Sequence, residues 1–218
     1  MPDGFVYLDE ESGDILWDAK YATKDNFTGA VVDGYEANRI ACSEEVMEGL
    51  LKARDIAAEK GYVLLVWDSA RPQRAVDRFV EWSREPEDGS TKEKHYPNLS
   101  KTSLFQNGYI ARRSGHSRGC AVDLTLVDAK TGEEIDMGGG FDLMDERSHH
   151  GAKGISAEQA ENRNILKNIM RRAGFQPYSA EWWHYSLRDE PYPNTYFDFA
   201  IAEEAEAEFI APAPPSIE

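Results

Sequence analysis

The chain holds five histidines, and two of them stand beside other groups that can do chemistry. His116 lies in a turn of small residues that leads into an alternating run containing Asp123. His184 follows Glu181 by three positions, next to tryptophans that can exclude water from a polar pair. Two imidazoles and one carboxylate are a ligand set of hydrolytic zinc sites, which leave the fourth position to water. His116, Asp123 and His184 therefore predict a site for one zinc ion per chain.

Two further side chains would complete a hydrolytic site. Glu181 is a candidate general base, since a carboxylate beside a zinc-bound water can take its proton and pass it to the leaving amine. Arg71, held on a turn by Pro72, is a candidate cation for the oxyanion that forms when a carbonyl becomes tetrahedral. On a regular strand Glu181 and His184 would point to opposite faces, so this interpretation requires a bend or loop at Glu181.

Simpler interpretations of these residues stay open at this stage. An isolated histidine is more often hydrogen-bonded or solvated than a ligand, and Arg71 could pair with a surface carboxylate. His149 and His150 are adjacent, so their side chains diverge, which favours a solvated or supporting position over metal binding. Cys120 could attack as a thiolate with His116 as its base, but it falls on the core face of its strand, where thiols are usually inert.

The elements that must position these groups alternate without a regular repeat. Short apolar clusters at 5–8 and 30–32 predict short strands and loops. Ser43 is the expected N-cap of an amphipathic helix that ends before Gly61, and the apolar run 62–67 predicts a buried strand.

Arg71 must precede the next helix, expected over 73–84, because proline restricts the residue before it to extended geometry. Residues 85–108 are rich in Pro, Gly, Ser and Lys and predict a long excursion, with His95 as a loop residue. Alternation over 120–127 predicts a strand, with Asp123 on its non-core face, that enters a hairpin through a turn at 128–132.

A capping box at Ser156 opens a helix that Gly174 closes, and a final strand is expected over 182–187. These elements predict the α+β class: a single domain, 1–202, with a small central antiparallel sheet flanked by helices. Residues 203–218 form an acidic, proline-containing tail, expected to be a helix end or a frayed extension.

Composition excludes several classes of protein. The chain of 218 residues is 41% hydrophobic and 29% charged, as ordinary folded domains are. With 24 Lys and Arg against 40 Asp and Glu, its net charge of −16 disfavours nucleic acids and anionic membranes as partners. Two cysteines support neither a disulfide framework nor a four-cysteine zinc site. The absence of a signal segment and of any apolar run of about 18 residues predicts a cytoplasmic location. The sequence is compatible with assembly into a homo-oligomer.

The chemistry-bearing segments resemble the motifs of one enzyme family. Residues 114–123 (Ser-Gly-His-Ser-Arg-Gly-Cys-Ala-Val-Asp) and 181–184 (Glu-Trp-Trp-His) are similar to the S-x-H-x-x-G-x-A-x-D and E-x-x-H motifs of zinc D,D-peptidases. With Ser-Ala-Arg-Pro at 69–72 and Gly-Phe-Asp at 140–142, they resemble the VanX-type D-alanyl-D-alanine dipeptidases over about residues 5 to 200. Gly115 and Cys120 stand at spacer positions where serines are expected in this family.

The resemblance implies that His116, Asp123 and His184 hold zinc, with Glu181 as general base and acid and Arg71 stabilising the tetrahedral intermediate.

It further implies substrate-binding roles for Ser114, Asp142 and Tyr21, in which an acidic group suits the free ammonium of a dipeptide. The reaction implied is hydrolysis of D-Ala-D-Ala to two D-Ala, in glycopeptide resistance or in dipeptide recycling. Two alternatives stay open: a D,D-carboxypeptidase that trims longer peptidoglycan precursors, and a non-catalytic, zinc-containing module that binds short peptides.

Overall fold

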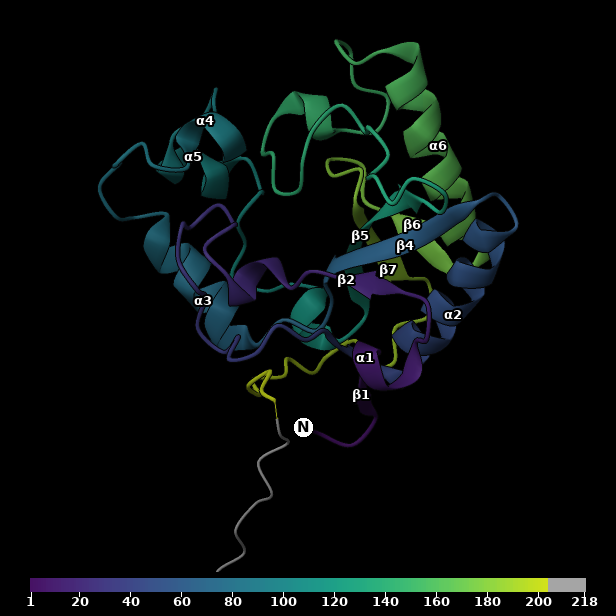
Figure 1. The fold of residues 1–218 in the computed structure, drawn as a ribbon. Helices are drawn as coiled ribbons and strands as arrows, with labels where there is room; N and C mark the ends of the chain where they lie inside the picture. Colours follow the sequence, from purple (N-terminus) through teal and green to yellow (C-terminus); the bar gives the residue numbers. More distant parts are fainter. Residues whose placement is uncertain (204–218) are drawn as a thin grey trace, which may run out of the picture.

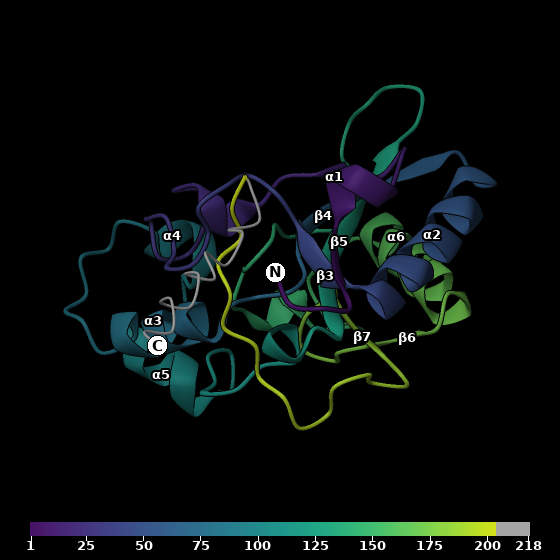
Figure 2. The same ribbon diagram turned by 90° about the horizontal axis from the view of Figure 1, so that it is seen from below.

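A five-stranded sheet lies at the centre of the computed structural model, which describes residues 1–203 (Figure 1). Its strands lie in the order β2 (Leu16–Trp17), β4 (Tyr62–Asp68), β5 (Ala121–Asp128), β7 (His184–Leu187) and β6 (Phe175–Pro177). All neighbours are antiparallel except β2, which runs parallel to β4. A separate two-stranded ribbon pairs β1 (Phe5–Tyr7) with β3 (Ala41–Ser43) (Figure 2).

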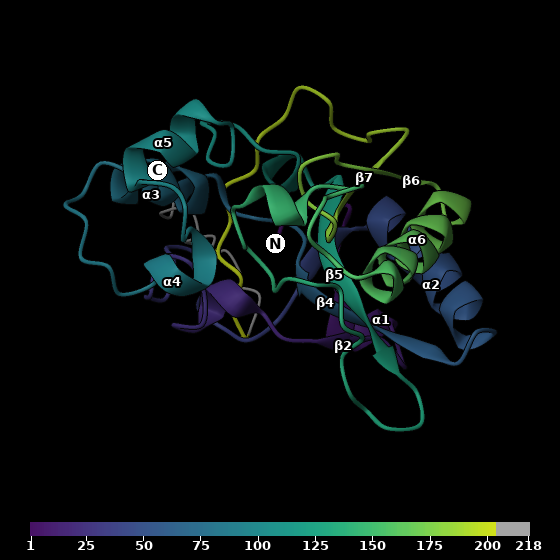
Figure 3. The same ribbon diagram turned by 90° about the horizontal axis from the view of Figure 1, so that it is seen from above.

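The helices form two groups on opposite sides of the molecule (Figures 1 and 3). Its α-helices are α1 (Leu8–Glu11), α2 (Glu44–Ala58), α3 (Gln73–Trp82), α4 (Lys92–His95), α5 (Lys101–Gln106) and α6 (Ala157–Arg172). Short 3-10 turns are η1 (Lys20–Ala22), η2 (His116–Arg118) and η3 (Glu146–Ser148). Helices α2 and α6 lie side by side against one side of the sheet, while α3, α4 and α5 gather on the other side of the molecule (Figures 1 and 3). None of these helices is long and apolar enough to cross a membrane.

Local signals account for the two long helices. Ser43 Oγ accepts the backbone N–H of Val46 at 3.2 Å, so the expected N-cap of α2 is confirmed. The capping box at the start of α6 is also formed, between Ser156 and Gln159. The α+β class is confirmed as well, with the correction that the sheet is mixed, because the two-residue edge strand β2 joins it in parallel.

Several expected boundaries differ from the observed ones. The cluster at 30–32 forms no strand, and the hairpin after β5 is reduced to one isolated bridge, from Val127 to Glu134. The excursion 85–108 contains the short helices α4 and α5. The expected tail lies outside the described residues from position 204 onward.

Candidate metal centre and active site

Neighbouring strands place three side chains in one row across the sheet. Asp123 on β5 lies directly opposite His184, the first residue of β7, and opposite Asp68, the last residue of β4. A shift in register between Val66 and Asp68 turns Asp68 to the face of Asp123. Directly opposed residues have Cβ atoms about 5 Å apart, so Asp123 and His184 can share one ion.

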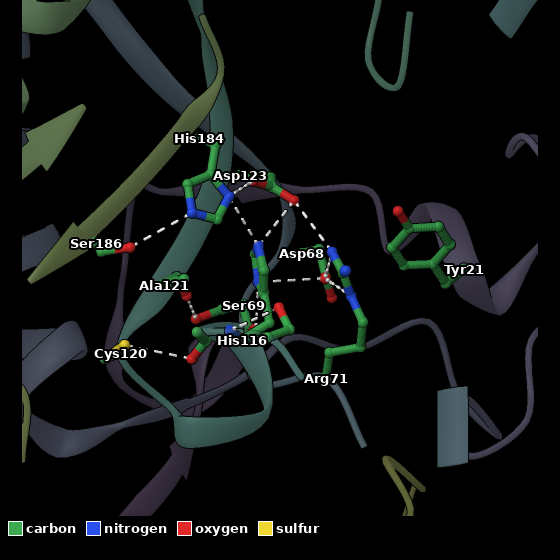
Figure 4. A network of polar contacts seen from close by, with 12 residues as sticks. Tyr21, Asp68, Ser69, Arg71, His116, Cys120, Ala121, Asp123, His184 and Ser186 are labelled. Carbon is green, nitrogen blue, oxygen red and sulfur yellow. Dashed lines mark hydrogen bonds and ion pairs between the residues drawn. The ribbon is translucent and has the colours of Figure 1, made fainter. Parts of the chain in front are cut away.

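His116 reaches the same point from outside the sheet. It opens the turn η2, and Gly119, with φ of +70°, lets the chain turn from there into β5. The ring Nδ1 lies 2.7 Å from the carbonyl oxygen of Ser69, which can only accept, so Nδ1 carries the proton. In the neutral ring Nε2 is then unprotonated, and it faces His184 and Asp123 (Figure 4).

The donor atoms of these three residues converge. His116 Nε2 lies 3.1 Å from His184 Nδ1 and 3.2 Å from one oxygen of Asp123, and His184 Nδ1 lies 3.0 Å from the other oxygen. Ligand atoms of a tetrahedral zinc site with bonds of about 2.1 Å lie about 3.4 Å apart, so the group fits a shared ion. Ser186 Oγ, 3.4 Å from His184 Nε2, can accept the proton of that nitrogen and leave Nδ1 to the metal.

Glu181 lies in a turn that immediately precedes β7. The expected strand over 182–187 begins only at His184, whose backbone N–H donates to the carbonyl of Glu181 at 3.3 Å. This turn supplies the bend that the sequence analysis requires, and it brings Glu181 Oε2 to 3.9 Å from His184 Nδ1. Burial raises the pKa of Glu181 to about 7.

Asp68, which the sequence analysis does not assign to the site, holds Arg71 in place. Its Oδ2 accepts from Arg71 Nε at 2.8 Å and lies 2.7 Å from Nη2, and its Oδ1 accepts from the hydroxyl of Tyr35 at 2.6 Å. Arg71 Nη2 also lies 3.3 Å from Asp123 (Figure 4). The sequence signal that could have identified Asp68 is its position as a charged residue at the end of a buried apolar strand. A buried carboxylate needs cationic or hydrogen-bonding partners, and these lie close to the site.

A cavity of about 300 Å³ opens beside the three donor residues. The Tyr21 hydroxyl donates to Asp142 Oδ2 at 2.8 Å, and Asp142 has a left-handed backbone with φ of +55°. Ser114 Oγ accepts the backbone N–H of His116 at 3.2 Å. Every residue predicted for the site lines this cavity: Tyr21, Arg71, Ser114, His116, Asp123, Asp142, Glu181 and His184.

Known proteins resemble this chain over most of its length. A family model described as "D-ala-D-ala dipeptidase" matches residues 1–202. The chain belongs to this family. It is 57% identical over 201 residues to the D-alanyl-D-alanine dipeptidase of Enterococcus faecium, covering 92% of this chain and all of that protein. The dipeptidases of Enterococcus faecalis and Streptomyces coelicolor are 55% and 54% identical over 202 residues, which cover 93% of this chain and all of each relative.

The remaining candidates of the sequence analysis lie outside the donor group of this D-Ala-D-Ala dipeptidase family member. His149 is half-buried, and its Nε2 lies 3.1 Å from the hydroxyl of Tyr109. Cys120 is buried and donates to the carbonyl of Gly115, and burial raises the pKa of its thiol to about 11, which disfavours a thiolate nucleophile. The expectation for His95 is wrong: it ends α4 and is 2% exposed.

Proposed function

We propose that the chain is a zinc peptidase that hydrolyses the dipeptide D-Ala-D-Ala to two molecules of D-Ala. The observation that carries this proposal is the convergence of His116, Asp123 and His184 at a cavity that Glu181 and Arg71 also line. The names of the relatives, which match over their whole length, support the choice of substrate. We place the catalytic domain within residues 1–202, where the family match lies.

Each residue of the site would have a distinct role in hydrolysis. Zinc, held by His116, Asp123 and His184, would supply Lewis-acid polarisation and lower the pKa of water. Glu181, close to His184, would take a proton from the attacking water and hand it to the leaving amine. The Arg71 guanidinium, fixed by two contacts to Asp68, would stabilise negative charge on the carbonyl oxygen.

Asp142 and Tyr21 would bind the ammonium of the dipeptide. Burial and the nearby charge of Asp123 raise the pKa of Asp142 well above its usual value. An ammonium beside Asp142 is the partner that favours the ionised carboxylate, and the Tyr21 hydroxyl holds one of its oxygens. A site that pairs both charged ends of a dipeptide rejects longer chains, because their extra residues leave its polar groups unpaired. We assign Ser114 to substrate positioning as well. A cytoplasmic location, where free dipeptide would be met, stays a prediction.

Release of D-alanine by the purified protein tests the proposal. D-Ala-D-Ala is incubated beside L-Ala-L-Ala and a longer peptide that ends in D-Ala-D-Ala, before and after chelation and after addition of zinc. We expect hydrolysis of the D,D-dipeptide alone, loss on chelation and recovery with zinc. Preferred cleavage of the longer peptide would favour a D,D-carboxypeptidase. Tight dipeptide binding by the zinc-loaded protein without turnover would favour a binding module.

Replacing Asp68 with asparagine tests whether Asp68 holds the Arg71 guanidinium in place. The variant keeps the shape of the side chain and removes its charge, so Arg71 loses its charge-assisted bonds to Asp68 and keeps the contact with Asp123. We expect kcat/KM for D-Ala-D-Ala at saturating zinc to fall by about 10- to 100-fold. Asp68 Oδ2 also lies 3.4 Å from His116 Nδ1, so the affinity for zinc is measured beside the rate. Tyr35→Phe, which removes only one hydrogen bond to Asp68, is the matched control and should cost less than about threefold. An Asp68→Asn enzyme as active as the parent would contradict the role of Asp68.

A further inference from the structure

Asp142, the residue proposed to bind the substrate ammonium, has an unusual backbone conformation. In residues 1–203 it is the only residue other than glycine with a positive φ, at +55°. Such a left-handed conformation is strained for a residue with a side chain and persists where surrounding contacts hold it. Leu143 and Met144, which follow Asp142, are buried, so these contacts come from the protein interior.

His95 supplies two of the contacts to this segment. Its Nδ1 lies 3.2 Å from the carbonyl oxygen of Asp142, and because that oxygen can only accept, Nδ1 donates. The backbone carbonyl of His95 accepts the N–H of Met144 at 2.7 Å. His95 therefore binds the chain on both sides of Leu143. Burial lowers the pKa of His95 to about 4, so the ring is neutral at pH 7 and its second nitrogen carries no proton.

The excursion 85–108, which carries His95, also binds the segment that carries Tyr21. Thr91 Oγ1 donates to the carbonyl of Phe27 at 2.6 Å, and Lys94 forms an ion pair with Asp25. The views from below and above both show α4 beside the N-terminal segment around η1 (Figures 2 and 3). The excursion thus contacts Asp142 itself and the segment that carries Tyr21, its partner in the Tyr21–Asp142 hydrogen bond.

We propose that His95, together with the excursion 85–108, positions the carboxylate of Asp142 for the substrate ammonium. His95 acts as a positioning residue: it holds the carbonyl of Asp142 and so the direction of the Asp142 side chain. This inference rests on the proposed function and gives the excursion a role in substrate binding.

Three replacements of His95 separate positioning from packing. Asparagine keeps a donor nitrogen bonded to Cγ, as in the Nδ1 of histidine, whereas glutamine carries its donor one bond further out. Leucine fills space without a donor. Dissociation constants for D-Ala-D-Ala are measured by calorimetry in the zinc-loaded Glu181→Gln background, in which turnover is expected to be about a thousandfold slower. We expect the constant to rise about tenfold for His95→Leu and His95→Gln and to stay within about threefold for His95→Asn.

A double-mutant cycle with Asp142→Asn decides whether the effect passes through Asp142. In the Asp142→Asn background, His95→Leu should change the dissociation constant by less than about twofold, because the carboxylate it positions is gone. Zinc content and thermal midpoint of each variant show whether the fold is intact. Equal effects of His95→Leu in both backgrounds would overturn the inference, and so would a His95→Leu protein that binds as tightly as its parent.

Measurements on the wild-type chain distinguish a failure of this inference from a failure of the proposed function. If the wild-type chain hydrolyses D-Ala-D-Ala and the His95 variants bind it normally, the inference fails alone. If the wild-type chain neither binds nor hydrolyses the dipeptide, the proposed function and the inference fail together. Binding that depends on His95 through Asp142, without hydrolysis by the wild-type chain, would support the inference and overturn the proposed enzymatic function.

Discussion

Replacing Glu181 with glutamine should lower kcat for D-Ala-D-Ala by about a thousandfold while the protein keeps its metal, since a positioned general base contributes about 10²- to 10⁴-fold. Glutamine has the shape of glutamate but cannot accept the proton of the attacking water. The three predicted ligands are other residues, and Glu181 Oε2 lies 3.9 Å from His184 Nδ1. The measurement is kcat together with the zinc content per chain.

Glu146→Gln is the matched control for this change, because Glu146 is an exposed carboxylate on the turn η3. It should leave both the rate and the zinc content unchanged. A Glu181→Gln protein that turns over at nearly the wild-type rate would rule out Glu181 as the base. Loss of zinc in that protein would instead make Glu181 a ligand, and the mechanism would need another base.

The sequence predicts the long elements and the site residues because their signals are local. Ser43 and Ser156 begin their helices through bonds to residues only three positions away. Alternation along β5 indicates which face carries Asp123, and the motif spacing supplies candidates for its partners. The edge strand β2 has no such signal: it is two residues long, and it pairs with a strand almost fifty positions further along the chain.

The roles of Asp68 and His95 at the site could not be predicted from the sequence, for the same physical reason. Asp68 faces the site only because a shift in register at the end of β4 turns its side chain toward Asp123. His95 acts on the carbonyl of Asp142, 47 positions away, whose left-handed backbone is not visible in the residue type. Long-range register and backbone strain are tertiary properties, so the supporting residues of a site are harder to predict than its ligands.

Replacing Asp123 with asparagine should abolish metal binding and activity together. Asp123 is 2% exposed, and its two oxygens contact His116, His184 and Arg71. Burial opposes ionisation, but without a metal ion the charge and hydrogen bonds of the two histidines hold the pKa of Asp123 well below its usual value. A bound divalent cation would take over that role and keep the carboxylate charged at pH 7. Asparagine keeps the volume, removes that charge and offers a weaker ligand to a divalent cation.

We expect the Asp123→Asn protein to lose most of its zinc on dialysis and to hydrolyse D-Ala-D-Ala at least about a thousandfold more slowly, since a metal contributes several kcal/mol to the transition state. Zinc at a concentration that restores the chelated wild-type enzyme should fail to restore the variant. The contrast with Glu181→Gln is the decisive comparison, because a base variant loses the rate and keeps the metal, whereas a ligand variant loses both. An Asp123→Asn protein that is folded, holds one zinc per chain and works at a normal rate would show that Asp123 serves the fold through Arg71 and the histidines, and that another group completes the metal site.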